Sequence, residues 1–173
     1  MAGAEKGTSK KTASPTRRIL QAAWKRREPA MWVAIFALVV AVQWPTLKGW
    51  YYGAAVTEAP ASAVAWRTDL STALAEARST NKRVLVDFYA SWCPPCIAMK
   101  HEVWPDADVA RAVNAGYIPV VVDADHDNGL SSRFRVEGIP AILLLDADGR
   151  VVKRNDGFLP RDGMLKFLAQ AAE

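Results

Sequence analysis

Two cysteines, Cys93 and Cys96, are the only cysteines in the chain, and two residues separate them. The apolar, β-branched run Arg83–Ala90 precedes them, which predicts a buried strand. A helix is expected to begin at Pro94. A Cys-x-x-Cys pair at a strand-to-helix turn can alternate between a dithiol and a disulfide with little backbone movement. The spacing therefore predicts a redox-active pair.

Structural roles for the pair fit the spacing less well. A disulfide that closes so short a loop constrains the unfolded chain little, so it cannot hold a small secreted fold together. A closed zinc site needs four ligands, whereas the chain offers only two histidines, His101 and His126, far apart in sequence. We expect no metal at the pair, and dithiol chemistry needs no cofactor.

The position of each cysteine predicts its role. Cys93 is expected at the N-cap of a helix with solvent access, where the positive helix end lowers the thiol pKa below about 8.5. Cys96, one turn later and more buried, would resolve the mixed disulfide. Pro94 and Pro95 suit a first turn but remove N–H donors that would stabilise the Cys93 thiolate. A less stable thiolate favours the reducing end of a range from about −270 to −120 mV.

The elements around the pair predict an α/β fold. Asp69 can cap a helix that reaches Thr80, and the turn residues 146–149 favour an antiparallel hairpin. A further helix is expected from Pro94 to His101. The remaining elements are expected at 106–114 (helix), 117–122 (strand), 129–135 (short helix), 141–145 and 150–154 (hairpin strands) and 160–171 (a helix that buries Met164, Leu165 and Leu168). This order gives a mixed sheet with helices on both faces.

A long uncharged run, Pro29–Leu47, predicts one N-terminal transmembrane helix. Its nineteen residues would extend about 28 Å as a helix, close to the thickness of a hydrocarbon core. Trp32 near one end and Trp44 near the other fit an interfacial aromatic belt. The alternative is a cleaved signal peptide, since small residues near 59–63 offer a cleavage site. The long charged region before the run favours an uncleaved anchor.

The charge distribution predicts the orientation of that anchor. Residues 1–28 hold eight Lys/Arg against two acidic residues, a net charge of +6, and residues 29–173 hold fourteen against sixteen, a net charge of −2. The basic residues belong to a short tail, expected to be disordered, so a nucleic-acid-binding surface is not predicted. The cations keep the tail cytoplasmic, and the body then faces the periplasm or its equivalent. Residues 48–65 are expected to be a linker to a domain at 66–173.

Two stretches resemble the thioredoxin family: VLVDFYASWCPPC and FRVEGIPAILLLDADGRVV. Both occur in order and at family spacing, so the resemblance covers nearly all of residues 66–173. Trp66, the run Asp69–Leu74 and the segment KHEVWPDADV resemble most closely the periplasmic C-terminal domain of the reductant conveyor DsbD and its membrane-tethered relatives. The resemblance implies a thioredoxin-like fold and thiol–disulfide exchange.

The resemblance assigns roles to four more residues. Asp87 matches a buried acid behind the cysteines, whose pKa would be raised and which would accept the Cys96 proton; a surface position is the alternative. Pro140 matches a cis-proline that docks substrate backbone, preceded here by Ile139 where many relatives have threonine. Trp92 matches an aromatic residue that shields the site, although a strand-end tryptophan can also be core.

Two other groups of polar residues are interpreted as structural. His101 is expected to be a polar residue on a helix face. The cluster Asp123, Asp125, His126 and Asp127 has some metal-ligand character, but it lacks the spaced oxygens and glycine of a calcium loop. It is predicted to be a solvated turn.

These features predict a disulfide reductase tethered to the outer face of an inner membrane. It would pass electrons from a membrane thiol reductant conveyor to disulfides of exported proteins, with apocytochromes as candidate substrates in cytochrome c maturation. An oxidant or isomerase of the same fold is one alternative. A tethered assembly factor whose cysteines do not turn over is another.

Overall fold

The computed structural model describes residues 15–55, 58–127 and 129–170, and the chain divides into two compact units between Gln43 and Trp44. Within the described residues the elements are α1 Pro15–Ala55, α2 Leu70–Thr80, β1 Arg83–Tyr89, α3 Pro94–Glu102, α4 Ala107–Gly116, β2 Tyr117–Asp123, α5 Leu130–Phe134, β3 Ala141–Leu145, β4 Val151–Asp156 and α6 Arg161–Ala169. The expected elements of the C-terminal domain are all present, with boundaries that differ by one or two residues.

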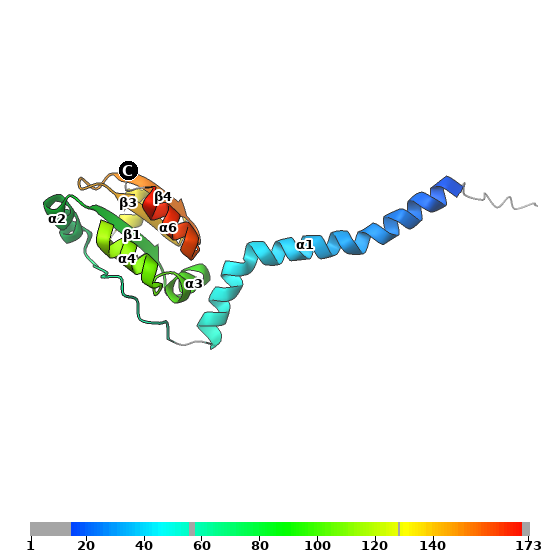
Figure 1. Ribbon diagram of the computed structural model, residues 1–173, viewed down its shortest axis with the longest axis horizontal. Helices are drawn as coiled ribbons and strands as arrows, with labels where there is room; N and C mark the ends of the chain where they lie inside the picture. The colour runs from blue at the N-terminus through cyan, green and yellow to red at the C-terminus, as the bar shows by residue number, and fades with distance from the viewer. Residues whose placement is uncertain (1–14, 56–57, 128, 171–173) are drawn as a thin grey trace, which may run out of the picture. The chain divides into compact units, whose positions relative to one another are not determined.

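The four strands form one mixed sheet in the order β2-β1-β3-β4 (Figure 1). β1 pairs in parallel with β2 and antiparallel with β3, and β3 pairs antiparallel with β4. The predicted hairpin is confirmed: β3 and β4 flank a turn in which Gly149 adopts φ +81. Because β1 is central, the residues that follow its end emerge from the middle of the sheet.

Helices cover both faces of this sheet, because successive strand residues point to opposite sides. One layer packs against α3, α4 and α6, and its buried members include Leu85, Met99, Val109, Ile142 and Met164. The other packs against α2 and α5, and its buried members include Leu74, Val86, Phe88, Phe134 and Leu143. Burial of each such side chain stabilises the fold by about 1.5–3 kcal/mol. The predicted α/β architecture is confirmed.

Local signals set the ends of the helices next to the sheet. Asp69 caps α2 by accepting the Thr72 N–H, as predicted. The helix ends at Asn81, which adopts the left-handed region at φ 52, a conformation that asparagine tolerates better than most residues. In α6 the buried side chains are Met164, Phe167 and Leu168. Leu165, expected to be buried, is only partly so, because the face of α6 is rotated toward Phe167.

The N-terminal helix is longer than the expected anchor. Residues 15–28, expected to be disordered, are helical from Pro15 onward. Proline is favoured at a first helical position, and Ala, Leu, Gln, Lys and Arg are strong helix formers. Residues 1–14 lie outside the described residues. One helical stretch, Pro29–Ala54, is long and apolar enough to cross a membrane, and it contains the predicted span 29–47.

The region expected to be a linker contributes to structure at both ends. Its first residues, through Ala55, continue α1. Near its other end Val64 is buried in the core, and the Asn114 side chain bonds to the backbone of Ala63 and Ala65. Residues 56 and 57 lie outside the described residues. The part of residues 48–65 that belongs to no helix and packs on no core is therefore shorter than expected.

Candidate active site

The two cysteines lie at the connection from β1 to α3, as the spacing predicts. Cys93 is the N-cap of α3 in an extended conformation, Pro94 and Pro95 occupy the first two helical positions, and Cys96 is the third. The cysteines are joined by a disulfide with Cα atoms 5.3 Å apart. The Cys96 N–H donates to the Cys93 sulfur at 3.3 Å. The Cys93 sulfur thus lies at the positive end of the helix and receives one backbone donor from the first turn.

The burial of the cysteines differs from the prediction. Cys93 was expected to have solvent access and Cys96 to be more buried, but Cys93 is 2% exposed and Cys96 is 6% exposed. The disulfide draws both sulfurs into one small cluster with Ala90, against which Tyr89 and Ile139 pack. In the disulfide form, therefore, exposure does not distinguish the two sulfurs. Only their positions on the helix do.

Ile139 and Pro140 lie beside the redox pair. The peptide bond between them is cis, as the resemblance implied. The Ile139 carbonyl oxygen is 3.7 Å from the Cys93 sulfur, and the Ile139 side chain packs on the cysteine cluster. The Pro140 carbonyl accepts the Gly157 N–H at 2.7 Å, which ties this turn to the end of β4. A long connection in sequence thus places Pro140 next to Cys93.

Asp87 is the buried polar residue of the described domain, 5% exposed, so the surface alternative is wrong. It follows Leu85 by two residues on β1 and therefore shares the face that α3 covers. Burial raises the pKa of Asp87 from 3.8 to about 7, although a hydrogen bond with the Trp104 side chain lowers it. A carboxyl with this pKa exchanges a proton near neutral pH.

The contact with Trp104 could not be found from sequence. Trp104 follows α3, is itself buried, and packs edge-on against Trp66 at 5.0 Å between ring centroids. Nothing in its sequence neighbourhood distinguishes it from an ordinary core tryptophan.

Trp92 is 64% exposed, so the core alternative for this residue is wrong. Its indole N–H donates to the Asp125 carboxylate at 2.8 Å. Asp125 belongs to the acidic cluster, which forms the turn that was predicted: Asp123 accepts the Asp125 N–H, and Asp127 accepts backbone N–H groups at the start of α5. The cluster therefore holds an aromatic side chain next to Cys93.

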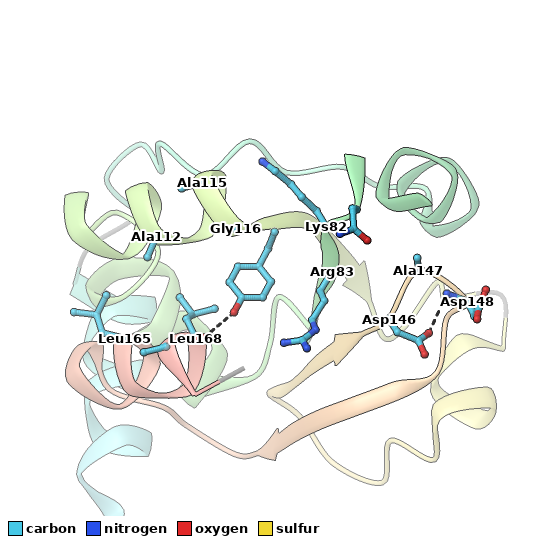
Figure 2. A pocket seen from close by; sticks show the side chains of 13 residues that line it. Lys82, Arg83, Ala112, Ala115, Gly116, Asp146, Ala147, Asp148, Leu165 and Leu168 are labelled. Carbon is cyan, nitrogen blue, oxygen red and sulfur yellow. Dashed lines mark hydrogen bonds between the residues drawn. The ribbon is translucent and has the colours of Figure 1, made fainter. Parts of the chain in front are cut away.

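Figure 2 shows a pocket of about 850 Å³ whose lining includes neither Cys93 nor Cys96. It is lined by Arg83 and Tyr117, the first residues of two parallel strands, whereas Cys93 follows the end of β1. Asp146 and Asp148 form part of its wall, and the Tyr117 hydroxyl donates to the Leu168 carbonyl. The pocket is thus at the opposite end of the sheet and contributes no residue to the site.

Comparison with known proteins agrees with this geometry. A family model described as a thioredoxin-like domain matches residues 70–172. The thiol:disulfide interchange protein DsbD of Cronobacter sakazakii is 32% identical over 122 residues, which cover 65% of this chain but 21% of that protein. A thioredoxin from Thermus thermophilus is 32% identical with a TM-score of 0.57, over 63% of this chain and 87% of that one. The oxidised C-terminal domain of DsbD from Neisseria meningitidis is 25% identical with a TM-score of 0.51, over 61% and 98%.

The chain belongs to the thioredoxin-like family. Its C-terminal domain is homologous to the C-terminal domain of DsbD, while the chain spans about a fifth of the DsbD relative that it matches. Members of this family are thiol–disulfide oxidoreductases, and this chain has a cysteine pair with the corresponding spacing, Cys93 and Cys96.

Proposed function

We propose that this protein is a membrane-anchored reductase of protein disulfides. The observation that carries the proposal is the Cys93–Cys96 disulfide at the N-terminus of α3, beside cis-Pro140 and on the face of the sheet that buries Asp87. One reactive sulfur at a helix end, one resolving sulfur and one buried proton acceptor are the groups that two-step disulfide exchange needs.

The reaction starts from the dithiol. The Cys93 thiolate attacks one sulfur of the substrate disulfide; that S–S bond breaks, a Cys93–substrate disulfide forms, and the leaving thiolate takes up a proton. Asp87 then accepts the Cys96 proton and the Cys96 sulfur attacks Cys93. The second substrate thiolate leaves, and the pair ends as the disulfide seen here. Two electrons pass from the dithiol to the substrate.

The surfaces around Cys93 supply a place for the substrate chain. Ile139 presents an apolar side chain where many relatives have threonine, and Pro140 follows it in the cis turn. Trp92 covers the other side of the strand end, held by Asp125. An extended substrate segment with an apolar residue next to its cysteine fits these surfaces.

The prolines support the reducing direction. Pro94 and Pro95 have no N–H, so the Cys96 N–H is the first donor in the helix that reaches the Cys93 sulfur. A thiolate with few donors is less stable, and the dithiol form loses electrons more readily. The homology to DsbD supports a membrane thiol reductant conveyor as the electron donor and exported proteins, including apocytochromes, as substrates.

The helix α1 supports single-pass anchoring in the inner membrane, with the catalytic domain on the periplasmic or extracytoplasmic side. The uncharged run Pro29–Leu47, the part of α1 proposed to lie in the membrane, follows eight cationic residues, which favour the cytoplasmic side. Lys48 and the residues after it in α1 lie beyond this run. Full-length protein should remain with membranes washed in high salt, with the domain accessible to protease from outside. Recovery of a soluble form that begins near Val64 would instead support a cleaved signal.

Trapping of mixed disulfides tests the catalytic assignment. Cys96→Ser should accumulate disulfide-linked complexes with partner proteins through Cys93, while Cys93→Ser should accumulate almost none. Stable adducts from Cys93→Ser would reverse the two roles. Failure of the wild type to turn over a generic protein disulfide would favour the non-catalytic assembly factor.

A measured reduction potential decides the direction of electron flow. Equilibration of the pair with a glutathione buffer should give a potential near the thioredoxin value of about −270 mV. A value near about −120 mV would instead make the protein an oxidant.

A further inference from the structure

The last part of α1, Trp44–Ala55 (the α1 end segment), lies in the same compact unit as the catalytic domain. Pro45 lies near its start and has no N–H to give to the preceding turn, so the helical hydrogen bonding is interrupted there. Pro45 therefore weakens the helix at the start of the α1 end segment. In the described part of the chain the segment contacts α3, the helix that has Cys93 as its N-cap and Cys96 in its first turn.

Polar contacts join the α1 end segment to the C-terminal end of α3. Lys48 Nζ donates to one carboxylate oxygen of Glu102 at 2.8 Å, and the Tyr52 hydroxyl donates to the other at 2.8 Å. The Tyr52 ring also stacks on His101, with centroids 4.4 Å apart and an interplanar angle of 4°. The Lys48 and Glu102 side chains are 32% and 25% exposed, so this ion pair is partly withdrawn from water.

Two glycines bring the α1 end segment close to the N-terminal end of α3. Gly49 is buried, and a Cβ atom at this position would overlap the backbone of Pro94. Gly53 is one turn further, where a Cβ atom would meet the Ile97 side chain at an ordinary 3.7 Å. Residues four apart share a helix face, so Gly49 and Gly53 form a flat strip against α3. Only the position of Gly49 requires the absence of a side chain.

The contact at Pro94 lies next to the reactive sulfur. Pro94 directly follows Cys93, which is 2% exposed, and Ile139 already covers the cysteine cluster from the cis turn. A protein that brings its own cysteine to Cys93 needs an open surface wider than a single sulfur. The docked segment occupies the side of α3 that begins at Pro94 and Ile97.

We propose that the α1 end segment is a shield built into the chain: docked on α3, it hinders protein-sized partners from reaching Cys93, and its release admits them. The shield rests on the proposed function, since it matters only where Cys93 exchanges disulfides with proteins. Small thiols reach the sulfur whether or not the segment is docked. The partner binds the surface that the segment leaves, and these contacts offset the free energy needed to release the segment.

Two glycine substitutions test the shield in the full-length chain. Gly49→Ala introduces the overlap with Pro94, whereas Gly53→Ala makes the same chemical change on the same helix without one. Both raise helix propensity equally. We measure how fast the Cys93–Cys96 disulfide is reduced by dithiothreitol and by a reduced, thioredoxin-sized dithiol protein. Gly49→Ala should speed the protein reaction by about tenfold or more, as expected for a closed state that opens about a tenth of the time or less. Gly53→Ala should match the wild type, and the dithiothreitol rates should not change.

A charge exchange supplies a second test that does not depend on glycine. Lys48→Glu places two carboxylates together and should speed the protein reaction, and the double variant Lys48→Glu/Glu102→Lys should restore the slow rate. Hydrogen exchange of residues 44–55 reports docking directly. Protection should fall in Gly49→Ala and in Lys48→Glu, and it should return in the double variant.

Each other outcome overturns a definite part of the proposal. Unchanged protection in Gly49→Ala and Lys48→Glu would show that the segment is not docked. Lost protection with an unchanged protein rate would show a docked segment that shields nothing. If the wild type and Gly49→Ala both react with dithiothreitol but neither reacts with a dithiol protein, the shield is not the barrier to the protein reaction. Absence of any thiol reaction would contradict the proposed function, while hydrogen exchange would still report on docking.

Discussion

Aspartates occur on two sides of the redox pair in opposite environments. Asp87 lies inside the sheet layer, where burial raises its pKa to about 7. Asp127 lies in the acidic turn, where hydrogen bonds from Ser131 lower the pKa of its carboxyl. The residue type is the same in both places. Burial away from water raises the pKa of Asp87, and hydrogen bonds donated to the carboxylate lower the pKa of Asp127.

The comparison separates a chemical role from a structural one. A carboxyl that titrates near pH 7 can take a proton from a thiol and return it, so Asp87 suits proton transfer to and from Cys96. A carboxylate that stays ionised throughout the neutral range cannot. Asp127, whose pKa is lowered, is such a carboxylate. Hydrogen bonds of Asp123, Asp125 and Asp127 hold the acidic turn and the Trp92 indole in place.

The largest expected effect concerns the stability cost of the buried charge. Between pH 3.8 and about 7 the unfolded chain loses the Asp87 proton while the folded chain keeps it. The stability of the wild type should therefore fall as pH rises through this window and level off above it. At about 1.4 kcal/mol per pKa unit, a shift of about three units costs at most about 4 kcal/mol at pH 8.

Asp87→Asn should thus be more stable than the wild type at pH 8 by up to about 4 kcal/mol. The difference should shrink toward pH 4, where both side chains are neutral. Urea unfolding of the oxidised full-length chain in detergent at the two pH values measures it. A wild type that gains stability between pH 4 and pH 7 relative to Asp87→Asn would mean that Asp87 is ionised in the folded protein.

The next effect is on the rate at which Cys96 resolves the mixed disulfide. Asp87 accepts a proton only when ionised, so the wild-type rate should rise with pH around a midpoint of about 7. Asp87→Asn should lack this midpoint and be slower by about tenfold to a hundredfold at neutral pH. Stopped-flow release of a fluorescent substrate thiol follows the step. Asp148→Asn, in the exposed turn before β4 and away from the redox pair, is the matched control and should keep the wild-type pH dependence.

A smaller effect on stability, with the opposite dependence on pH, is expected for Asp127 in the acidic turn. Asp127 accepts the N–H groups of Gly129 and Ser131, and its pKa is lowered from 3.8. Its contribution to stability is present at neutral pH and is lost as pH falls below that value. Asp127→Ala should therefore be less stable than the wild type at pH 7, and the gap should close toward pH 2. A gap that widens in acid would contradict the assignment.

The smallest effect concerns Trp92. Asp125→Ala removes the acceptor of its indole N–H, and Trp92→Phe removes the donor. Each should weaken the reaction with a protein substrate by about twofold to fivefold, as expected for one exposed hydrogen bond, and leave reaction with dithiothreitol unchanged. The double variant should be no worse than the poorer single variant. Additive losses would show that the two side chains act separately.

Much of the C-terminal domain could be predicted because its signals are local. The apolar run of β1, the Asp69 cap, and the turn before β4 each specify an element within a few residues. The N-cap position of Cys93 follows from the strand-to-helix turn in the same way. Its burial does not, because the residue that covers it, Ile139, is 46 positions away in sequence.

The other differences also arise from contacts between distant segments. Lys48 meets Glu102 across 54 positions, and Trp92 meets Asp125 across 33. Local sequence patterns do not indicate such pairs. The linker was predicted from the small residues in 53–65. Gly49, outside that run, and Gly53, at its start, instead allow the α1 end segment to approach α3.

The sequence by itself determined the order of elements, the spacing and helix position of Cys93 and Cys96, and the long apolar run in α1. These depend on covalent neighbours, whose influence on backbone and periodicity is direct. The tertiary structure alone decided that Asp87 is enclosed, that Trp92 is exposed and held, and that Gly49 lies against Pro94. The physical reason is that burial, and with it the pKa and reach of a side chain, is a property of everything that surrounds a residue in space rather than of its neighbours along the chain.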